Sequence, residues 1–501
     1  MIPPKPTERL FQSALVVVAL LAAAPSLGAE SAVRDSVVKV LVTHRYPNLI
    51  KPWTKHASKK SSGSGVVIDG RRILTNAHVV RFASQIYIQA FQSDDKVLAK
   101  ISAIAPGIDL AVLEVEDDSF YDRRPALAMS KSLPNVKDTT NVYGYPLGGD
   151  ELSITEGIVS RIEFTAYYKE TVGLRIQVDA ALNPGNSGGP AIVDGHVVGL
   201  VFSGIRQADN IGYLIPVEEI EIFLEDIEDG HFDGKPQMFD LLQPVENAAL
   251  RARLGLPENM GGAMVQAPYR EEENYPLETW DVITHIGEYA LDRESKVLVG
   301  DDLRLFFTYL IPRLAKEKTV SLTVWRDRVP IDVLLPVKVS RDIVIRHLKN
   351  EYPSYFIYGP MVFSPATQEL VGSLGRITTL LSIRASPLIS RRADEVAFEN
   401  EQIVVVTSGL FPHPIIKGYK GAQLQVVDEI NGIKIKNLSH LVESLRDNRD
   451  PFVVLTFAGR GHETLVFQRS EIFAATDEIL EDNGIRYQSS LDLRDVWVVG
   501  Q

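Results

Sequence analysis

The sequence predicts a mainly β protein with several domains. Between residues 66 and 217, short runs of Val, Ile and Leu are separated by Gly, Pro, Asn and Asp; examples lie at 86–90, 97–101, 174–178 and 197–202. Many short apolar runs at close spacing are typical of an antiparallel sandwich or barrel. The chain has 501 residues and is too long for one hydrophobic core, so we expect two to four domains.

The composition narrows the possible functions. The apolar fraction of 45% and the charged fraction of 23% are ordinary for soluble globular proteins. A formal net charge of −13 disfavours a general nucleic-acid binder. The absence of cysteine excludes disulfides, thiol nucleophiles and cysteine-ligated metals. The sequence also has neither a His-Glu-x-x-His motif nor a phosphate loop, so we expect no metal and no cofactor.

The N-terminus has the pattern of an export signal. Two basic residues precede an apolar run at 14–24, which is too short to span a bilayer comfortably. Small residues follow, and cleavage after Gly28 or Ala29 would fit them. We therefore interpret residues 1–29 as a secretory signal peptide of a periplasmic protein, with an uncleaved membrane anchor as the alternative.

The clearest chemical signal is the stretch NPGNSGGP at 183–190. Glycines on both sides of Ser187 allow a tight turn that presents the hydroxyl and leaves backbone amides free, among them those of Gly185 and Ser187. A nucleophilic serine needs such amides, because its attack on a carbonyl creates an oxyanion. A Gly/Asn/Pro turn between two strands is the alternative.

Two upstream segments supply partners for this serine. His78 lies at the end of the apolar segment 71–80, and Asp109 begins a short apolar run. Imidazole titrates near neutral pH, so His78 is the candidate general base, and Asp109 would accept from its other ring nitrogen. The order His, Asp, Ser is that of the chymotrypsin-type triad and differs from the subtilisin and α/β-hydrolase orders.

The motifs around these residues resemble those of the Deg/HtrA family of trypsin-like serine proteases. They are GSGVVI at 63–68, LTNAHVV at 74–80, DLAVL at 109–113, GYPLG at 144–148, EGIVS at 156–160, GNSGGP at 185–190 and NIGYLIP at 210–216. The resemblance implies a chymotrypsin-like double β-barrel in a protease domain at 30–228. His78 and Asp109 would come from the first barrel and Ser187 from the second.

The substrate pocket is expected to be apolar. Ala181 lies at the offset where trypsin keeps its acidic residue, and Leu182 follows it. A pocket lined by Leu182 and Phe202 predicts cleavage after Val, Ala or Ile. Asp179 is expected outside this pocket.

A helix at 217–228 and a linker at 229–244 should lead to a first PDZ domain at 245–345. The supporting pattern is a glycine turn, a strand, the segment 280–287, a helix at 301–314 and a strand at 320–325. The turn Gly261-Gly262-Ala263-Met264 matches the position of the loop that holds a peptide carboxylate. A small α/β domain without a ligand is the alternative.

A second PDZ-like domain is expected at 346–501. It has a hairpin at Asn431-Gly432, a helix at 439–446 and a strand at 452–457. The block between the two domains resembles plant-type Deg proteases, in which the second PDZ-like domain mainly contributes to assembly.

These features indicate an ATP-independent serine endopeptidase that degrades unfolded proteins. The family builds on trimers, so we expect a homo-oligomer, either a trimer or a hexamer. The insertion at 44–62, rich in aromatic and basic residues, is either a subunit contact or a plain surface loop. A peptide-binding chaperone and a PDZ scaffold are the rival functions; an intact triad argues against both.

Overall fold

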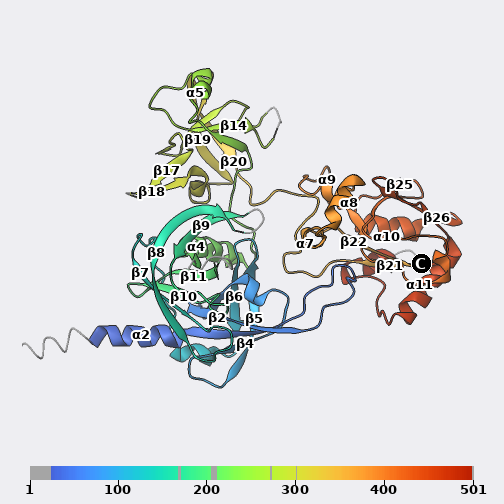
Figure 1. The fold of residues 1–501 in the computed structure, drawn as a ribbon, viewed down its shortest axis with the longest axis horizontal. Helices are drawn as coiled ribbons and strands as arrows, with labels where there is room; N and C mark the ends of the chain where they lie inside the picture. The colour runs from blue at the N-terminus through green and yellow to red at the C-terminus, as the bar shows by residue number, and fades with distance from the viewer. Residues whose placement is uncertain (1–23, 168–170, 205–211, 271–273, 301, 499–501) are drawn as a thin grey trace, which may run out of the picture. The chain divides into compact units, whose positions relative to one another are not determined.

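The computed structural model describes residues 24–498 apart from 168–170, 205–211, 271–273 and 301 (Figure 1). The chain forms two compact units. The first contains residues 1–44 and 60–340, and the second contains residues 45–59 and 341–501.

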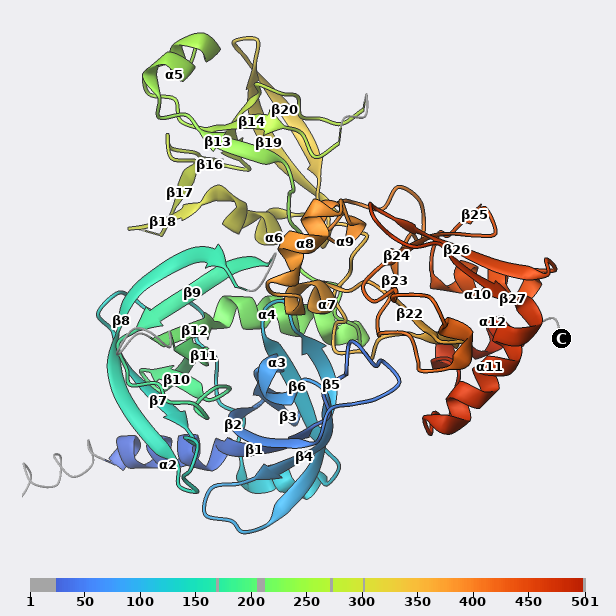
Figure 2. The same ribbon diagram turned by 45° about the vertical axis from the view of Figure 1, so that its right-hand side comes forward.

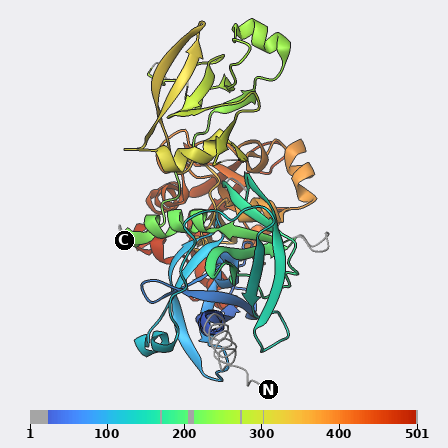
Figure 3. The same cartoon turned by 90° about the vertical axis from the view of Figure 1, so that its left-hand side faces the viewer.

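Two closed six-stranded barrels open the first unit, as the sequence predicts. The first barrel has the strand order β1 (Val37–His44), β2 (Lys59–Ile68), β3 (Arg72–Thr75), β6 (Leu110–Val115), β5 (Lys96–Ala105) and β4 (Ala83–Gln89). The second has the order β10 (Pro190–Val193), β11 (His196–Gly204), β12 (Gly212–Pro216), β9 (Val172–Val178), β8 (Ser153–Ala166) and β7 (Thr139–Gly144). Figure 3 shows the blue strands of the first barrel beside the teal strands of the second.

One apolar core joins the two barrels. Leu110 and Val112 of the first barrel and Leu200 of the second are fully buried in it. The helix α4 (Val217–Asp226) adds Ile220 and Phe223 to the same core, which confirms the predicted helix. Because the two barrels share this core, the loops at their adjoining ends keep fixed positions relative to one another.

The start of the protease region differs from the sequence-based expectation. The apolar residues within 31–43 predict a first strand over that range. The helix α2 (Ala24–Ser36) instead continues to Ser36, and β1 starts at Val37. Glu30 and Arg34 form an ion pair one helical turn apart at 2.6 Å, and the run of β-branched residues begins only after Ser36. The proposed signal peptide lies mostly in residues 1–23, outside the described residues.

A sheet completes the first unit, in the order β13 (Leu241–Pro244), β14 (Ala263–Ala267), β15 (Val282–Ile286), β19 (Thr319–Arg326) and β20 (Val329–Pro336). The short strand β16 (Tyr289–Ala290) pairs with β15, and α5 (Ala248–Leu254) precedes β14. The predicted helix at 301–314 is wrong in its first part. Residues Leu303–Phe306 form β18, paired with β17 (Lys296–Val299), before the short helices η3 (Phe307–Leu310) and α6 (Ile311–Leu314).

Only part of the predicted linker at 229–244 is a connection without structural contacts. Lys235 is buried and pairs with the buried Glu219 of α4 at 2.8 Å, and β13 already begins at Leu241. The short helix η3 also contacts α4, because the hydroxyl of Tyr309 donates to Glu218 at 2.9 Å. The linker region is thus tied to the protease barrels by buried charge.

The second unit is built on the strand order β21 (Phe356–Tyr358), β22 (Met361–Pro365), β23 (Val404–Val406), β24 (Val426–Ile430), β26 (Phe452–Ala458) and β27 (Leu465–Gln468). Figure 2 shows α10 (Leu438–Asp447), α11 (Arg469–Asp482) and α12 (Arg494–Val498) beside these strands. The predicted hairpin at Asn431-Gly432 is confirmed by pairing of Ile430 with Ile433, and α10 and β26 confirm the predicted helix and strand. Three further helices lie between β22 and β23: α7 (Gln368–Ser373), α8 (Ile377–Ile383) and α9 (Pro387–Ser390).

The insertion between β1 and β2 belongs to this second unit. The ring of Trp53 packs on Phe411 with centroids 5.5 Å apart, and the Lys55 ammonium lies 3.7 Å from the ring centroid of Tyr352. The Tyr352 hydroxyl donates to the Arg45 carbonyl at 2.9 Å. The segment is therefore an integral part of the C-terminal unit rather than a plain surface loop.

Candidate active site

Asp109 is the most constrained residue of the site. It has a φ of 58°, in the left-handed region that aspartate tolerates better than most residues, and its side chain is 2% exposed. Its Oδ1 accepts from the backbone N–H of His78 at 2.7 Å, and its Oδ2 lies 2.6 Å from His78 Nδ1. One buried carboxylate thus holds both the backbone and the ring of His78.

His78 lies on the one-turn helix α3 (Ala77–Val80), directly after β3. The Asp109 carbonyl accepts from the Ala77 N–H at 3.1 Å and from the Asn76 side-chain amide at 3.0 Å, so it caps the start of this turn. The His78 side chain remains 40% exposed. When Nδ1 carries the proton toward Asp109, Nε2 is the basic nitrogen. Within the described ranges, no hydrogen bond joins Nε2 to Ser187.

The serine loop consists of residues 183–189, directly before β10. It has no room for side chains at two of its glycines. Gly185 has a φ of 106°, and a Cβ there would lie 2.4 Å from the Tyr145 carbonyl oxygen. Gly188 has a φ of 87°, and a Cβ there would lie 2.1 Å from the Ser64 carbonyl oxygen. Glycine at both positions is therefore required by backbone conformation and by close contact.

The peptide groups of this loop are oriented by their carbonyls. The Pro184 carbonyl accepts from the Leu147 N–H at 2.7 Å, and the Asn186 carbonyl accepts from the Gly189 N–H at 2.9 Å. In a trans peptide the C=O and the N–H point in opposite directions, so these bonds also fix the N–H groups of Gly185 and Ser187. Among the described residues, neither N–H has a protein acceptor. Both are available to a bound oxyanion.

Ser64 on β2 connects the serine loop to the first barrel. It is fully buried, its N–H donates to the Ser187 carbonyl, and its hydroxyl donates to the Gly185 carbonyl, both at 2.8 Å. The same hydroxyl accepts from the Tyr145 N–H at 2.8 Å. The sequence patterns that mark the triad do not single out Ser64; its place in the motif at 63–68 is the only signal for it.

Comparisons with known proteins show which family the chain resembles. A model of the trypsin-like peptidase domain matches residues 63–200, and a model of the PDZ domain matches residues 344–492. Protease Do-like 2, chloroplastic, of Arabidopsis thaliana is 34% identical over 93% of this chain and 76% of its own length. A serine protease DegP homolog of Plasmodium falciparum is 43% identical over 81% of this chain and 58% of its own length.

The chain belongs to the Deg/Do-like family of serine proteases.

The chain is also similar to a solved structure of the HtrA-type protease AlgW with a tripeptide. The similarity covers 62% of this chain and 96% of that chain, with a TM-score of 0.49 and 24% sequence identity. The PDZ match at 344–492 confirms a PDZ domain in the C-terminal part of this Do-like protease.

The two predicted pocket residues of this Do-like protease lie in different apolar clusters. Leu182 is half-buried against the interior of the second barrel, and a Cβ on Gly212 would lie 2.2 Å from its Cδ1. Phe202 is buried in the core between the barrels, with its ring 5.4 Å from that of Tyr167. Asp179 accepts from the Ile158 N–H at 2.6 Å, which is a structural role at the surface. Residues 205–211, including Asn210 and Ile211 of a family motif, lie outside the described residues.

The predicted carboxylate loop Gly261-Gly262-Ala263-Met264 does not have an open site. The Gly262 N–H donates to the Asp292 carbonyl at 2.9 Å, and a Cβ on Gly261 would lie 2.2 Å from the Leu291 carbonyl oxygen. Ala263 and Met264 belong to β14, which is paired on both sides, by β13 and β15. The prediction is wrong because the neighbouring backbone already occupies the turn.

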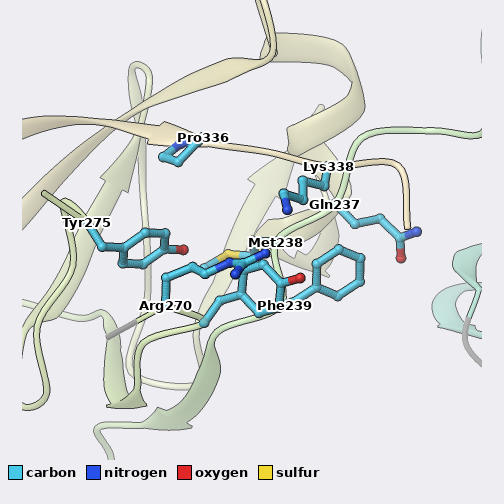
Figure 4. A pocket seen from close by; sticks show the side chains of 8 residues that line it. Gln237, Met238, Phe239, Arg270, Tyr275, Pro336 and Lys338 are labelled. Atoms are coloured by element: carbon cyan, nitrogen blue, oxygen red, sulfur yellow. The ribbon is translucent and has the colours of Figure 1, made fainter. Parts of the chain in front are cut away.

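A cavity of about 310 Å³ lies instead at the start of the end strand β13 (Figure 4). Its lining is mixed apolar, aromatic and basic and consists of Gln237, Met238, Phe239, Tyr269, Arg270, Tyr275, Pro336 and Lys338. Tyr275 of this lining donates its hydroxyl to Asp240 at 3.0 Å. Asp240 is buried, and burial raises the pKa of its carboxyl. The cavity therefore places basic side chains beside β13, which pairs only with β14 among the described residues. The chain just before this strand is bridged to the opposite side of the cavity, at Gln237 and Lys338.

Replacing Ser64 by Ala should destabilise the contact between β2 and the serine loop. The change leaves the Gly185 carbonyl and the Tyr145 N–H without their buried partner, which costs about 1–3 kcal/mol in free energy of unfolding. Amide hydrogen exchange in β2 and β10 measures this loss. Ser84→Ala is the control, because the exposed Ser84 hydroxyl donates only to the Thr43 carbonyl and should cost less than about 0.5 kcal/mol. Equal protection in both variants would contradict the role of Ser64.

Proposed function

We propose that this protein is an ATP-independent endopeptidase in which Ser187 is the nucleophile, His78 the general base and Asp109 the residue that orients His78. The observation that carries the proposal is the carboxylate of Asp109, which accepts from both the N–H and the ring of His78. The serine loop beside it has two N–H groups without protein acceptors among the described residues. Together these groups match the needs of acyl transfer.

The proposed reaction proceeds through an acyl-enzyme. His78 Nε2 takes the proton of Ser187 Oγ as this oxygen attacks the peptide carbonyl, and the N–H groups of Gly185 and Ser187 stabilise the oxyanion. The imidazolium, stabilised by Asp109, returns the proton to the leaving amine. Water then attacks the acyl-enzyme with His78 again as base, which releases the acid and restores Ser187.

An apolar preference for Val, Ala or Ile before the cleaved bond belongs to the same proposal. Leu182 lies two residues before Pro184 of the serine loop and packs on the barrel interior, so it supports an apolar pocket wall. Phe202 belongs to the core between the barrels. Its contribution would be to support the pocket rather than to contact the substrate.

We place peptide capture at the edge of β13 rather than at residues 261–264. An end strand can accept an extended peptide through main-chain hydrogen bonds, and Lys338 at its start can pair with a terminal carboxylate. Residues 245–345 would thus act as the first PDZ domain, which extends back to the strand at Leu241.

The second PDZ domain is proposed to have a packing or assembly role. The outer edge of its end strand β21 is already covered, because the Ile357 N–H donates to the Gln488 carbonyl at 2.9 Å. The ring of Trp497 also lies 5.0 Å from that of Phe356 on the same strand. A peptide ligand would have to displace these contacts first.

The physiological role that we propose is degradation of unfolded proteins by an oligomer built from trimers, a trimer or a hexamer, and light scattering measures its mass. None of the helices in the described ranges combines the length and apolar character of a membrane span. Residues 1–29 as a signal peptide and a periplasmic location remain part of this proposal; intact-mass analysis of the exported protein tests the cleavage.

Substitutions in the triad should abolish digestion of casein without ATP. Ser187→Ala should lower kcat about a million-fold and Asp109→Asn about 10⁴-fold, as in known serine-protease triads. Asp69→Asn is the matched control for the second change, because Asp69 is exposed and lies outside the site. Wild-type rates of digestion by Ser187→Ala would refute the proposed nucleophile.

Lys338→Met should weaken binding of apolar peptides that have a free C-terminus. The loss of one charge-assisted hydrogen bond predicts about a tenfold higher Kd. Calorimetry on the full chain, with Ser187→Ala to prevent cleavage, measures this constant. Lys318→Met in the same sheet region is the exposed control and should bind as before. If amidated peptides bind as tightly as free acids, or if Lys338→Met has no effect, the site is elsewhere.

A further inference from the structure

A buried lysine on the first barrel lies under the loop between β7 and β8. Lys39 of β1 is 7% exposed, and its ammonium donates to the Gly149 carbonyl at 2.9 Å and to Asp150 Oδ1 at 2.7 Å. Removing an ammonium from water is costly unless such partners replace the lost hydration. The Asp150 side chain is itself 93% exposed, so the buried end of this pair is Lys39.

The loop that Lys39 holds is in direct contact with the serine loop. The Leu147 N–H donates to the Pro184 carbonyl at 2.7 Å, and a Cβ on Gly185 would lie 2.6 Å from the Leu147 nitrogen. A turn joins Leu147 to the lysine, because the Gly149 N–H donates to the Pro146 carbonyl at 3.2 Å. The Tyr145 hydroxyl adds a contact to β1 by donating to the Val37 carbonyl at 3.4 Å.

These contacts connect the charge of Lys39 on the first barrel to one backbone peptide group of the serine loop, which precedes the second barrel's β10. The Pro184–Gly185 peptide has its C=O on Leu147, and its N–H is therefore fixed on the opposite side. If the loop at 146–150 shifts, the Leu147 N–H leaves Pro184 and this peptide can rotate. The Gly185 N–H then no longer points toward the oxyanion.

We propose that Lys39 is a positioning residue for the oxyanion hole, acting through Gly149 and Leu147 on the Gly185 N–H. The inference rests on the proposed peptidase mechanism, in which that N–H stabilises the transition state. A purely structural lysine would affect stability alone. A positioning lysine must also affect kcat more than KM, because the oxyanion forms only during the reaction.

The test compares Lys39→Met with wild type on a chromogenic peptide ester. Loss of a correctly oriented oxyanion donor costs on the order of 10²–10³ in kcat, so an indirect displacement should lower kcat about 10- to 100-fold with KM changed less than about twofold. Lys39→Arg keeps the charge and should restore part of kcat. Lys100→Met is the control, since Lys100 is exposed on β5 and, among the described residues, pairs only with Glu114.

Labelling of Ser187 by a fluorophosphonate separates this inference from the proposed function. Labelling in wild type but not in Ser187→Ala supports the nucleophile, and no labelling in wild type would refute the peptidase mechanism itself. Given a labelled wild type, an unchanged kcat in a folded Lys39→Met, or an equal loss in Lys100→Met, overturns the role of Lys39. If Lys39→Met does not fold, Asp150→Ala tests the same contact from an exposed position, where a loss of a few fold in kcat is expected and none would overturn the proposal.

Discussion

The proposed active site depends on one buried carboxylate. Asp109 is removed from water at the start of β6, and burial of a charge is tolerated only where hydrogen bonds replace the solvent. Its two oxygens accept from the N–H and the ring of His78, and its own carbonyl caps the turn that carries His78. The position, tautomer and backbone of the proposed base therefore follow from a single residue that directly precedes a barrel strand.

The proposed active site also requires that the serine loop, which precedes β10 of the second barrel, stays fixed to the first barrel. Ser64, fully buried on β2, donates to carbonyls on both sides of Asn186, while Leu147 holds the carbonyl of Pro184. In the proposed mechanism the N–H groups of Gly185 and Ser187 are oriented before the reaction, so they need no reorganisation when negative charge develops on the substrate. This arrangement explains why the serine motif contains glycines that are in contact with neighbouring backbone rather than merely flexible.

Much of the fold and of the proposed site follows from the sequence. The contacts between segments that lie far apart in the chain do not. The barrel strands, α4 and the pairing of His78 with Asp109 are predictable because apolar periodicity and local motifs determine them. The segment at 301–314 is ambiguous in period, and pairing with β17 makes its first part a strand. The turn at Gly261 and Gly262 looks open until Asp292 is placed against it, and the packing of Trp53 on Phe411 joins residues too distant in sequence to be paired by pattern. The buried position of Lys39 has the same cause, since its partners Gly149 and Asp150 lie 110 and 111 residues away in the sequence.

A crystal structure of the protein with a peptide boronic acid tests the central claim most directly. The account predicts a covalent bond from Ser187 Oγ to boron, one boronate oxygen within hydrogen-bond distance of the N–H groups of Gly185 and Ser187, and the His78 ring still bonded to Asp109. The bond from Leu147 to Pro184 should be retained. A boronate attached to another residue, or one whose oxygen points away from both N–H groups, would contradict the account.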